Sequence, residues 1–418
     1  MKQGYLSHYF KGVAAKTLSA VETDQSTSNQ HEFNGVSPLK RIFGTDKQRF
    51  PAKFIYLNDK DDCPVVDDGF LTWYDSRENN PLRTEHRMYF STTSVSTCAY
   101  AGDELFIGLT PDNTILAIVA ENGSTIANQI RWLFGITGID HEGFSVREEL
   151  ESERDRIAFA SRFILEQLGV EVEENEDVYL EEMLYRFEGR FPTTKEFSSF
   201  ARSTLRGVSP LDNPDAVLMN WMEREEILFR TLEKHFISEQ LSSQETFLKN
   251  NPNGGPGFDV DQFLKLSLSI QNRRKSRVGL AFENHVEQLF VCRNIRFDRA
   301  KVTEHNSKPD FIFPGIAEYH DEMYDADLLT MLGVKSTCKD RWRQVLAESD
   351  RIANKHLLTL EAAISENQTD EMQSKNLQLV VPIGIQDTYS EKQRKWLISL
   401  NDFIMIVFSR QAGIRDRS

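Results

Sequence analysis

Short apolar stretches separated by turn residues fill the first 140 residues of the chain. They lie at residues 53–57, 70–74, 87–90, 104–109 and 114–119. Between them fall Gly102 and the tripeptide Pro111-Asp112-Asn113. Short apolar runs bounded by such residues are typical of strands. We therefore expect an all-β N-terminal domain, followed by a helical exit over residues 146–168, where apolar and acidic residues recur at helical spacing.

An acidic stretch marks the expected domain boundary. Residues 171–190 contain eight Asp or Glu against two Arg, which is typical of a solvated connector. We place an N-terminal domain at residues 1–172 and a C-terminal domain at 173–418. Residues 194–250 have a helical pattern, and the Asn, Pro and Gly residues of 250–257 predict a loop that no helix or strand crosses.

Strand-like and helical patterns alternate in the remainder of the chain. We expect helices at 279–291, at 340–363 as one long helix, and near 392–400. Apolar runs at 310–313, 332–335, 377–381 and 403–408 lie between them or follow them. Such alternation predicts an α/β layer with a partly parallel central sheet. The expected fold class is therefore multidomain, with an α/β C-terminal domain and an all-β N-terminal domain.

Composition excludes several broad classes. The chain has 418 residues, 39% of them hydrophobic and 27% charged, which predicts a globular protein of two or three domains. No apolar run is long enough to span a membrane, and the first thirty residues contain no secretory signal, so we expect a cytoplasmic protein without membrane contact. Four widely spaced cysteines (63, 98, 292 and 338) argue against a disulfide scaffold and a zinc site.

Charge is distributed unevenly. The formal net charge is −15, which by itself argues against a polyanionic partner. Residues 271–301, however, hold eight Lys or Arg against three acidic residues. A local basic footprint for nucleic acid therefore exists in an acidic chain.

Three residues could carry phosphodiester chemistry. Asp310 follows a proline, Lys335 comes 25 residues later, and Glu348 follows 13 residues after that. Metal-dependent cleavage of a phosphodiester needs carboxylates to hold Mg²⁺ and a lysine that orients water and offsets negative charge. The ordinary alternative is a turn aspartate and a solvated lysine at a strand edge.

The helix expected after Lys335 adds to this hypothesis. Arg341 and Glu348 share one face of it, and Asp340 is suited to cap its start. The positive end of the helix, with Lys339, Arg341 and Arg343, would then favour an anion. An amphipathic helix with a solvated, ion-paired face is the alternative.

Several motifs resemble one known family. They are Arg190-Phe191-Pro192, residues 272–279 leading to Glu283, Lys308-Pro309-Asp310-Phe311, Tyr319-His320-Asp321, the run from Val334 through Gln344 to Glu348, and Leu379-Val380-Val381-Pro382. Together they resemble the EcoRII-type (type IIE) restriction endonucleases, a branch of the PD-(D/E)XK nuclease superfamily, from about residue 190 to 408.

The resemblance implies a restriction-endonuclease-like active centre. Asp310, Lys335 and Glu348 would form it, with Asp310 and Glu348 as Mg²⁺ ligands. Gly333 stands where the commonest form of the motif has a carboxylate, and Glu348 would supply the missing ligand. Glu283 resembles an additional acidic residue, and Tyr319 a tyrosine near the active site. The alternative for Glu283 is a solvated partner of Arg277 or Lys275. The alternative for Tyr319 is a packed tyrosine.

DNA contacts are also implied. Lys339, Asp340 and Arg341 are suited to a C·G-rich step in the major groove, in agreement with the family's CC…GG outer base pairs. Phosphate clamping is the alternative for these residues. Arg343 and Arg277 are further candidates for DNA contacts.

The N-terminal domain resembles a B3-like β-barrel that binds a second, effector copy of the recognition sequence. The motifs that carry this likeness are residues 16–19, 30–32, 73–77 and 83–87. Base edges would be contacted by His31, Arg83, Glu85 and Arg87, and phosphates by Lys16 and Arg77.

The function implied is Mg²⁺-dependent type II cleavage of both strands of double-stranded DNA. A near-palindromic site requires two centres related by a two-fold axis, which implies a homodimer. The N-terminal domain would restrain cleavage until it binds a second site. A non-catalytic DNA-binding regulator built on the same barrel and a nuclease of unrelated specificity are the competing hypotheses.

Overall fold

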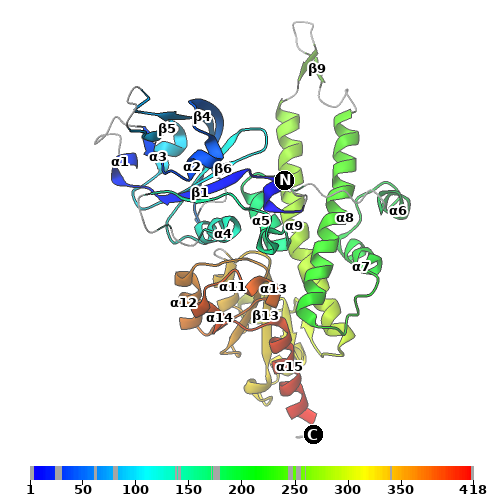
Figure 1. Ribbon diagram of the computed structural model, residues 1–418. Coiled ribbons are helices and arrows are strands. Elements are labelled where there is room, and N and C mark those ends of the chain that lie inside the picture. The colour runs from blue at the N-terminus through cyan, green and yellow to red at the C-terminus, as the bar shows by residue number, and fades with distance from the viewer. Residues whose placement is uncertain are drawn as a thin grey trace. The chain divides into compact units, whose positions relative to one another are not determined.

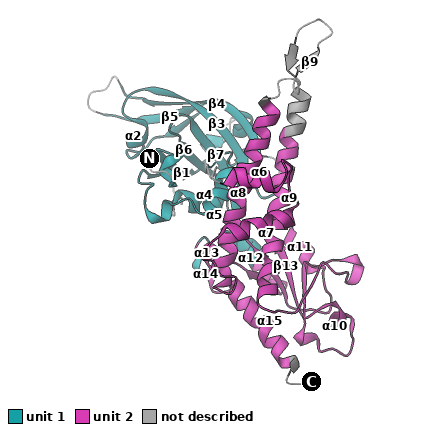
Figure 2. Ribbon diagram, turned by 90° about the vertical axis from the view of Figure 1, so that its right-hand side faces the viewer, with its two compact units in different colours: residues 1–172, 362–369, 388–391 teal, residues 173–361, 370–387, 392–418 magenta. Residues whose placement is uncertain are grey.

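The computed structural model describes residues 4–415 except for a set of short segments. These are 24–30, 61–63, 79–82, 137–138, 140–142, 171, 173–178, 243–247, 251–255, 259 and 339–340. The chain forms two compact units (Figure 2). Unit 1 comprises Met1–Val172, Ala362–Thr369 and Thr388–Glu391, and unit 2 comprises the rest. Two short segments that we expected in the C-terminal domain therefore group with unit 1.

Unit 1 is built on an eight-stranded sheet (Figure 1). Its strands in chain order are β1 (Gly12–Thr17), β2 (Glu32–Asn34), β3 (Gln48–Leu57), β4 (Val65–Asp75), β5 (His86–Phe90), β6 (Glu104–Leu109), β7 (Ile115–Ala120) and β8 (Ser145–Arg147). The order across the sheet is β2-β5-β4-β3-β7-β6-β1-β8, and all pairs are antiparallel except β3–β7. The five expected strands are confirmed as β3 to β7, whereas β1, β2 and β8 were not predicted.

The sheet of unit 1 is a half-barrel whose edge strands approach each other through side chains. Phe33 of β2 packs edge-on against Phe144, which precedes β8, with ring centroids 6.2 Å apart. The Nζ atom of Lys16 lies 5.8 Å from the first ring and 5.5 Å from the second. Both rings belong to the buried core of the unit.

Helices of unit 1 are short. They are α1 (Ala20–Thr23), α2 (Leu39–Phe43), α3 (Ser94–Cys98), α4 (Thr125–Phe134) and α5 (Phe159–Gln167). The expected helical exit is only partly correct, because it begins in β8 and becomes helical at Phe159. Helix α4 holds the segment 362–369: Gln129 Nε2 donates to the carbonyl of Ala362 (3.0 Å), and the amide of Ser365 donates to Thr125 Oγ1 (3.2 Å).

A helical layer begins unit 2. It consists of α6 (Leu180–Arg186), α7 (Thr194–Thr204), α8 (Pro214–Ser242) and α9 (Val260–Cys292). The two long helices α8 and α9 lie side by side (Figures 1 and 2). The strands β9 (Leu248–Asn250) and β10 (Pro256–Phe258) pair between them. These strands end at Asn250 and begin again at Pro256, so among the described residues no strand crosses the expected loop at 250–257.

The second part of unit 2 is a five-stranded mixed sheet. Its strands are β11 (Asp298–Arg299), β12 (Phe311–Phe313), β13 (Thr330–Lys335), β14 (Lys355–Thr359) and β15 (Leu377–Val380), which lie in that order. The β11–β12 and β12–β13 pairs are antiparallel, and the β13–β14 and β14–β15 pairs are parallel. The remaining helices are α10 (Ile316–His320), α11 (Trp342–Leu346), α12 (Glu366–Ser374), α13 (Ile383–Gln386), α14 (Glu391–Arg394) and α15 (Leu400–Arg415). The expected partly parallel sheet is confirmed.

The expected long helix at 340–363 is wrong. Helix α11 ends at Leu346, and Ser349 has a left-handed backbone with φ of 56°. Strand β14 then begins at Lys355, and all five of its residues are buried. A short apolar run in a buried parallel strand has no alternation that would distinguish it from helix.

The apolar run 403–408 lies in helix α15. Phe403, Ile404 and Val407 are buried, whereas Met405 and Phe408 are 58% and 37% exposed. Their spacing of three and four residues gives one buried stripe.

Among the described residues, no helix is both long and apolar enough to cross a membrane. The described cysteines, Cys98, Cys292 and Cys338, are free thiols.

Candidate active site

Asp310 and Lys335 meet at the junction of β12 and β13. Phe311 pairs with Leu332 across these antiparallel strands, so the residue before β12 lies near the end of β13. The carboxylate Oδ2 of Asp310 accepts hydrogen bonds from Lys335 Nζ (2.7 Å) and from the amide of Val334 (2.6 Å). Their side chains are 14% and 18% exposed, so the pair is packed yet reachable from solvent.

Glu348 adds a third charge to this pair. Its Oε2 atom is buried and makes no hydrogen bond among the described residues. Burial raises the pKa of Glu348 to about 7, and the nearby charge of Asp310 contributes to the rise while Lys335 opposes it. The three predicted catalytic residues are therefore close enough for the charges of Asp310 and Lys335 to change the pKa of Glu348.

Gly333 explains why the second carboxylate comes from outside β13. A Cβ atom at position 333 would lie 2.9 Å from Cγ2 and 3.2 Å from Cγ1 of Val345. Residues 333 and 335 point to the same face of the strand, because side chains alternate along it. Helix α11 thus occupies the place of a side chain at 333, and the turn after this helix delivers Glu348.

The donor set fits a hard divalent cation. Mg²⁺ takes oxygen ligands and is commonly held by one or two carboxylates together with water and phosphate oxygens. Asp310 and Glu348 are two such carboxylates, and the unbonded Oε2 of Glu348 is an oxygen that a cation would stabilise. No group of three or more His, Cys, Asp or Glu in the described part of the chain could hold a metal ion by itself. Substrate and water oxygens would have to complete the coordination.

Glu283 of α9 lies beside this site but has its own partner. Arg299 Nη2 donates to Glu283 Oε2 (2.8 Å), and Arg299 Nη1 donates to Glu287 Oε2 (2.6 Å). Burial raises the pKa of Glu283; the bond from Arg299 lowers it, and the charge of Asp310 raises it. The partner is therefore Arg299, not the Arg277 or Lys275 of the alternative hypothesis.

Tyr319 of α10 is buried and faces a different group. Its hydroxyl donates to Glu304 Oε2 (2.5 Å) and accepts a hydrogen bond from the amide of Arg351 (3.3 Å). Neither contact involves Asp310, Lys335 or Glu348. The structure places Tyr319 next to the turn that carries Glu348 rather than against the Asp310–Lys335 pair.

The predicted base-reading segment is only partly described, because Lys339 and Asp340 lie outside the described residues. Arg341 is exposed at the start of α11, and its amide donates to the carbonyl of Cys338 (2.7 Å). Arg343 is half-exposed and donates to Glu371 Oε2 (3.0 Å). Because α11 has five residues, the expected positive end of a long helix is wrong.

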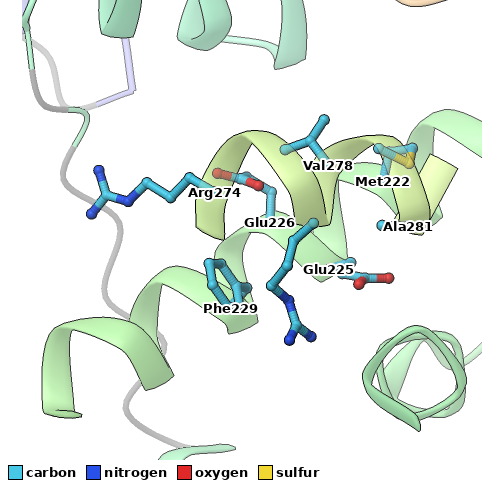
Figure 3. Close-up of a pocket in the computed structure, with 8 residues that line it drawn as sticks. Met222, Glu225, Glu226, Phe229, Arg274, Val278 and Ala281 are labelled. Carbon is cyan, nitrogen blue, oxygen red and sulfur yellow. The ribbon is translucent and has the colours of Figure 1, made fainter. Parts of the chain in front are cut away.

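Arg277 was predicted to contact DNA, and the structure contradicts this prediction. The side chain is buried, and Nη1 donates to the carbonyl of Pro192 (2.9 Å). Its guanidinium lies over Phe229 (4.6 Å) and Phe197 (5.1 Å), in the core between α7, α8 and α9. Arg277 lines a pocket together with Phe229 of α8 and Arg274 of α9, both labelled in Figure 3. Arg277 is a packing residue because it lies on the inner face of α9.

Lys16 was predicted to contact phosphate, and this prediction is also wrong. Its side chain is 2% exposed and forms an ion pair with Glu22, which is 8% exposed. The ammonium group also lies over Phe33 and Phe144, as described above. Lys16 points into the core of unit 1 and is inaccessible to a phosphate backbone.

Of the other N-terminal candidates, Arg87 lies on β5. His31 precedes β2, Arg83 and Glu85 precede β5, and Arg77 follows β4. Glu85 accepts from Arg77 Nε (2.6 Å) and Arg87 Nη2 (2.9 Å), and these two bonds lower the pKa of Glu85 to about 2. Arg87 also donates to Glu32 (2.9 Å), a residue that sequence reasoning missed although it stands next to His31 in the motif. His31 packs edge-on against Phe90, and Arg83 is exposed.

Comparison with known proteins gives a consistent assignment. Residues 229–404 match the family described as EcoRII C terminal. The type II restriction enzyme EcoRII of Escherichia coli is 38% identical over 217 residues, which are 51% of this chain and 50% of EcoRII. The chain therefore matches about half the length of that relative.

Two solved structures are more distant. Metal-depleted Ecl18kI in complex with uncleaved, modified DNA is 19% identical with a TM-score of 0.45, covering 58% of this chain and 86% of that one. A PspGI–substrate DNA complex is 19% identical with a TM-score of 0.42, covering 52% and 94%.

The mixed sheet, with the Asp310–Lys335 pair at its β12–β13 junction, forms a restriction-endonuclease-like α/β domain. Residues 229–404 match the EcoRII C-terminal family, and the resemblance to EcoRII-type restriction endonucleases is confirmed.

Proposed function

We propose that the protein is a type II restriction endonuclease that hydrolyses both strands of double-stranded DNA at a short CC/GG-flanked site, with Mg²⁺ as cofactor. The observation that carries this proposal is the Asp310–Lys335 ion pair, with Glu348 near enough for the charge of Asp310 to raise its pKa and with the Oε2 atom of Glu348 buried. The proposal is supported by the 38% identity to the type II restriction enzyme EcoRII, which extends over half of the length of that enzyme. A cytoplasmic location follows from the proposed substrate.

The reaction would be an attack of a water oxygen on phosphorus. A new P–O bond forms as the bond from phosphorus to the 3′ oxygen breaks. The attacking water gives up one proton and the leaving 3′ oxygen takes one up, so that the products are a 5′-phosphate and a 3′-hydroxyl. Lys335 would hold the attacking water and offset the charge that develops on the phosphate. Asp310 keeps the ammonium group in place through its 2.7 Å contact. A Mg²⁺ ion held by Asp310 and Glu348 would polarise the phosphate and stabilise the leaving oxygen.

Replacing Lys335 tests this proposal. Lys335→Ala should reduce plasmid cleavage in Mg²⁺ at least 100-fold, which is about the loss expected for one transition-state donor. Lys392→Ala is a matched control, because Lys392 Nζ lies 2.7 Å from Asp370 Oδ2, the same distance as in the Lys335–Asp310 pair, but its side chain is 61% exposed. Absence of cleavage by the wild type, or full cleavage by Lys335→Ala, would favour the non-catalytic DNA-binding hypothesis. End mapping would identify a nuclease of unrelated specificity.

Sequence reading is proposed for Lys339, Asp340 and Arg341, which follow β13 and precede α11. Arginine and lysine can donate to guanine O6 and N7, and aspartate can accept from cytosine N4. Two such domains would have to meet on a two-fold axis to cut both strands of a near-palindrome, so we propose a homodimer.

For unit 1 we propose a B3-like effector domain that binds a second copy of the site through His31, Arg83, Glu85, Arg87 and Arg77. The exposed Arg83 and the ion-paired cluster around Glu85 support a DNA-facing surface. Unit 1 also includes residues 362–369, which follow β14 of the catalytic sheet in the chain and are held by α4.

The hydrogen bonds between α4 and residues 362–369 allow a test of whether unit 1 restrains cleavage. Gln129→Ala removes the bond to the Ala362 carbonyl and should raise cleavage of a single-site plasmid. Deletion of residues 1–172 should raise it further. Slower cleavage by both would show that unit 1 assists the reaction instead.

A further inference from the structure

The Glu348 carboxylate is carried by a turn, residues 347–352, that local sequence alone does not stabilise. The amide of Glu348 donates to the carbonyl of Val345 (3.2 Å) as α11 ends, and the amide of Ile352 donates to the carbonyl of Ser349 (2.9 Å). Ser349 between them has φ of 56°, a left-handed conformation that non-glycine residues rarely adopt. The surroundings must hold the turn in this shape.

Two consecutive amides of the turn are held by Tyr319 and Glu304. The amide of Asp350 donates to Glu304 Oε2 (3.3 Å), and the amide of Arg351 donates to the Tyr319 hydroxyl (3.3 Å). The Tyr319 hydroxyl in turn donates to the same Glu304 oxygen (2.5 Å). Tyr319 is fully buried, so its ring has little freedom to turn away.

Two side chains bind the turn from other directions. Lys355 Nζ donates to the carbonyls of Ile352 (2.8 Å) and Ser349 (3.3 Å) and is itself buried. The Arg351 guanidinium donates to the carbonyls of Tyr319, Asp321 (2.9 Å) and Tyr324 (2.9 Å). The turn after Glu348 and the residues after α10 are therefore one connected unit.

We propose that Tyr319, with Glu304, is a positioning residue that fixes the 347–352 turn and so places the Glu348 carboxylate beside Asp310. It does not act on the phosphate itself. This inference deepens the proposed nuclease function and rests on it for its effect on metal binding. Outer residues that orient metal ligands commonly change metal affinity by 10- to 100-fold when removed.

Tyr319→Phe removes the hydroxyl and keeps the ring. Tyr324→Phe is the matched control, since the Tyr324 hydroxyl is buried and makes no hydrogen bond among the described residues. Hydrogen exchange at the amides of Asp350 and Arg351, followed by mass spectrometry of metal-free protein, should be faster in Tyr319→Phe and unchanged in Tyr324→Phe. This readout does not depend on nuclease activity.

Metal binding is the second readout. Binding of Mn²⁺, measured by electron paramagnetic resonance of the free ion with the enzyme on a duplex it recognises, should weaken roughly 10- to 100-fold in Tyr319→Phe. The Mg²⁺ concentration for half-maximal cleavage should rise by the same factor, and the rate at saturating Mg²⁺ should stay near that of the wild type. Glu304→Gln, which keeps an acceptor oxygen, should lie between the wild type and Tyr319→Phe.

Two results would overturn the proposal. One is unchanged hydrogen exchange in Tyr319→Phe. The other is a lower rate at saturating Mg²⁺ with unchanged Mn²⁺ affinity, which would make Tyr319 a catalytic residue. If the wild type cleaved no DNA while the turn still exchanged faster in Tyr319→Phe, the nuclease function would fail and the positioning of the turn would stand.

Discussion

The side chain of Val345 occupies the space that a side chain at Gly333 would need. The 2.9 Å between Val345 Cγ2 and a Cβ at position 333 is shorter than carbon atoms tolerate. This contact places α11 on the face of β13 that carries Lys335. Position 333 of the strand therefore has no carboxylate, and the turn after α11 carries Glu348 instead.

Adding a methyl group at position 333 should therefore disturb both stability and activity. Gly333→Ala should lower the free energy of unfolding by roughly 1–3 kcal/mol, because overpacking forces α11 away from the sheet. Cleavage should fall as Glu348 moves with the helix. Chemical denaturation and plasmid cleavage measure the two effects.

A double-mutant cycle provides the control for this prediction. Val345→Ala should relieve the Gly333→Ala variant, with a coupling of at least about 0.5 kcal/mol. Gly279→Ala should be close to neutral, since a Cβ atom there meets nothing within 4 Å. Additive effects of the two substitutions would show that the contact does not set the position of α11.

The raised pKa of Glu348 predicts a pH dependence of stability in the absence of metal. The folded state binds a proton at Glu348 up to about pH 7, whereas the unfolded chain releases it near 4.5. The free energy of unfolding should therefore fall as pH rises from 4.5 to 7, by at most about 3 kcal/mol from this group. Glu348→Gln should remove this slope.

Denaturation at several pH values measures the difference between wild type and Glu348→Gln. At pH 8, Mg²⁺ should stabilise the wild type more than the variant, because the cation favours the ionised carboxylate. Parallel pH profiles for the two proteins would mean that Glu348 is solvated in the folded state and that neither burial nor the charge of Asp310 raises its pKa.

Lys16 should contribute to stability and not to DNA affinity. Breaking a buried ion pair from one side commonly costs about 3–5 kcal/mol, because the remaining charge stays buried. Lys16→Met should therefore destabilise the protein strongly, and the double variant Lys16→Met, Glu22→Gln should recover much of the loss. Lys11→Met is the exposed control; Lys11 donates to Asn113 Oδ1 (2.6 Å) at the surface.

The DNA measurement distinguishes this role from the phosphate contact expected earlier. The slope of log affinity against log salt concentration should be the same for Lys16→Met and wild type, since no phosphate charge is neutralised by a buried lysine. A slope smaller by about one unit in Lys16→Met would show that Lys16 contacts a phosphate after all.

Sequence patterns predicted the strands around Asp310 and Lys335 because apolar runs next to charged residues mark the ends of buried strands. They did not predict the end of α11, which depends on the left-handed Ser349 and on the Gly333–Val345 contact. Both depend on tertiary structure, whereas local periodicity at 340–363 is compatible with one helix. Glu304 was missed for the same reason, since its contacts with Tyr319 and Asp350 connect distant parts of the chain.

Motif position also did not reveal which way a basic side chain points. Arg277 and Lys16 stand in basic or motif-rich segments, yet both are buried against phenylalanine rings. A lysine or arginine can cover apolar surface with its stem and pair its charge inside the fold. Only the packing of α9 and β1 shows that these two residues belong to the core.

Arg341 provides the sharpest test of sequence reading. It is exposed at the start of α11, six residues after Lys335 in the chain. If its guanidinium donates to guanine O6 and N7, Arg341→Ala should weaken binding by roughly 1–3 kcal/mol and relax discrimination at one base pair. Binding to a set of duplexes with single base-pair changes measures both effects, and Arg394→Ala is the control, because Arg394 is an arginine at the surface that is paired with Asp387 and is not a predicted DNA contact. Equal weakening on every duplex, with a smaller salt dependence, would instead identify Arg341 as a phosphate contact.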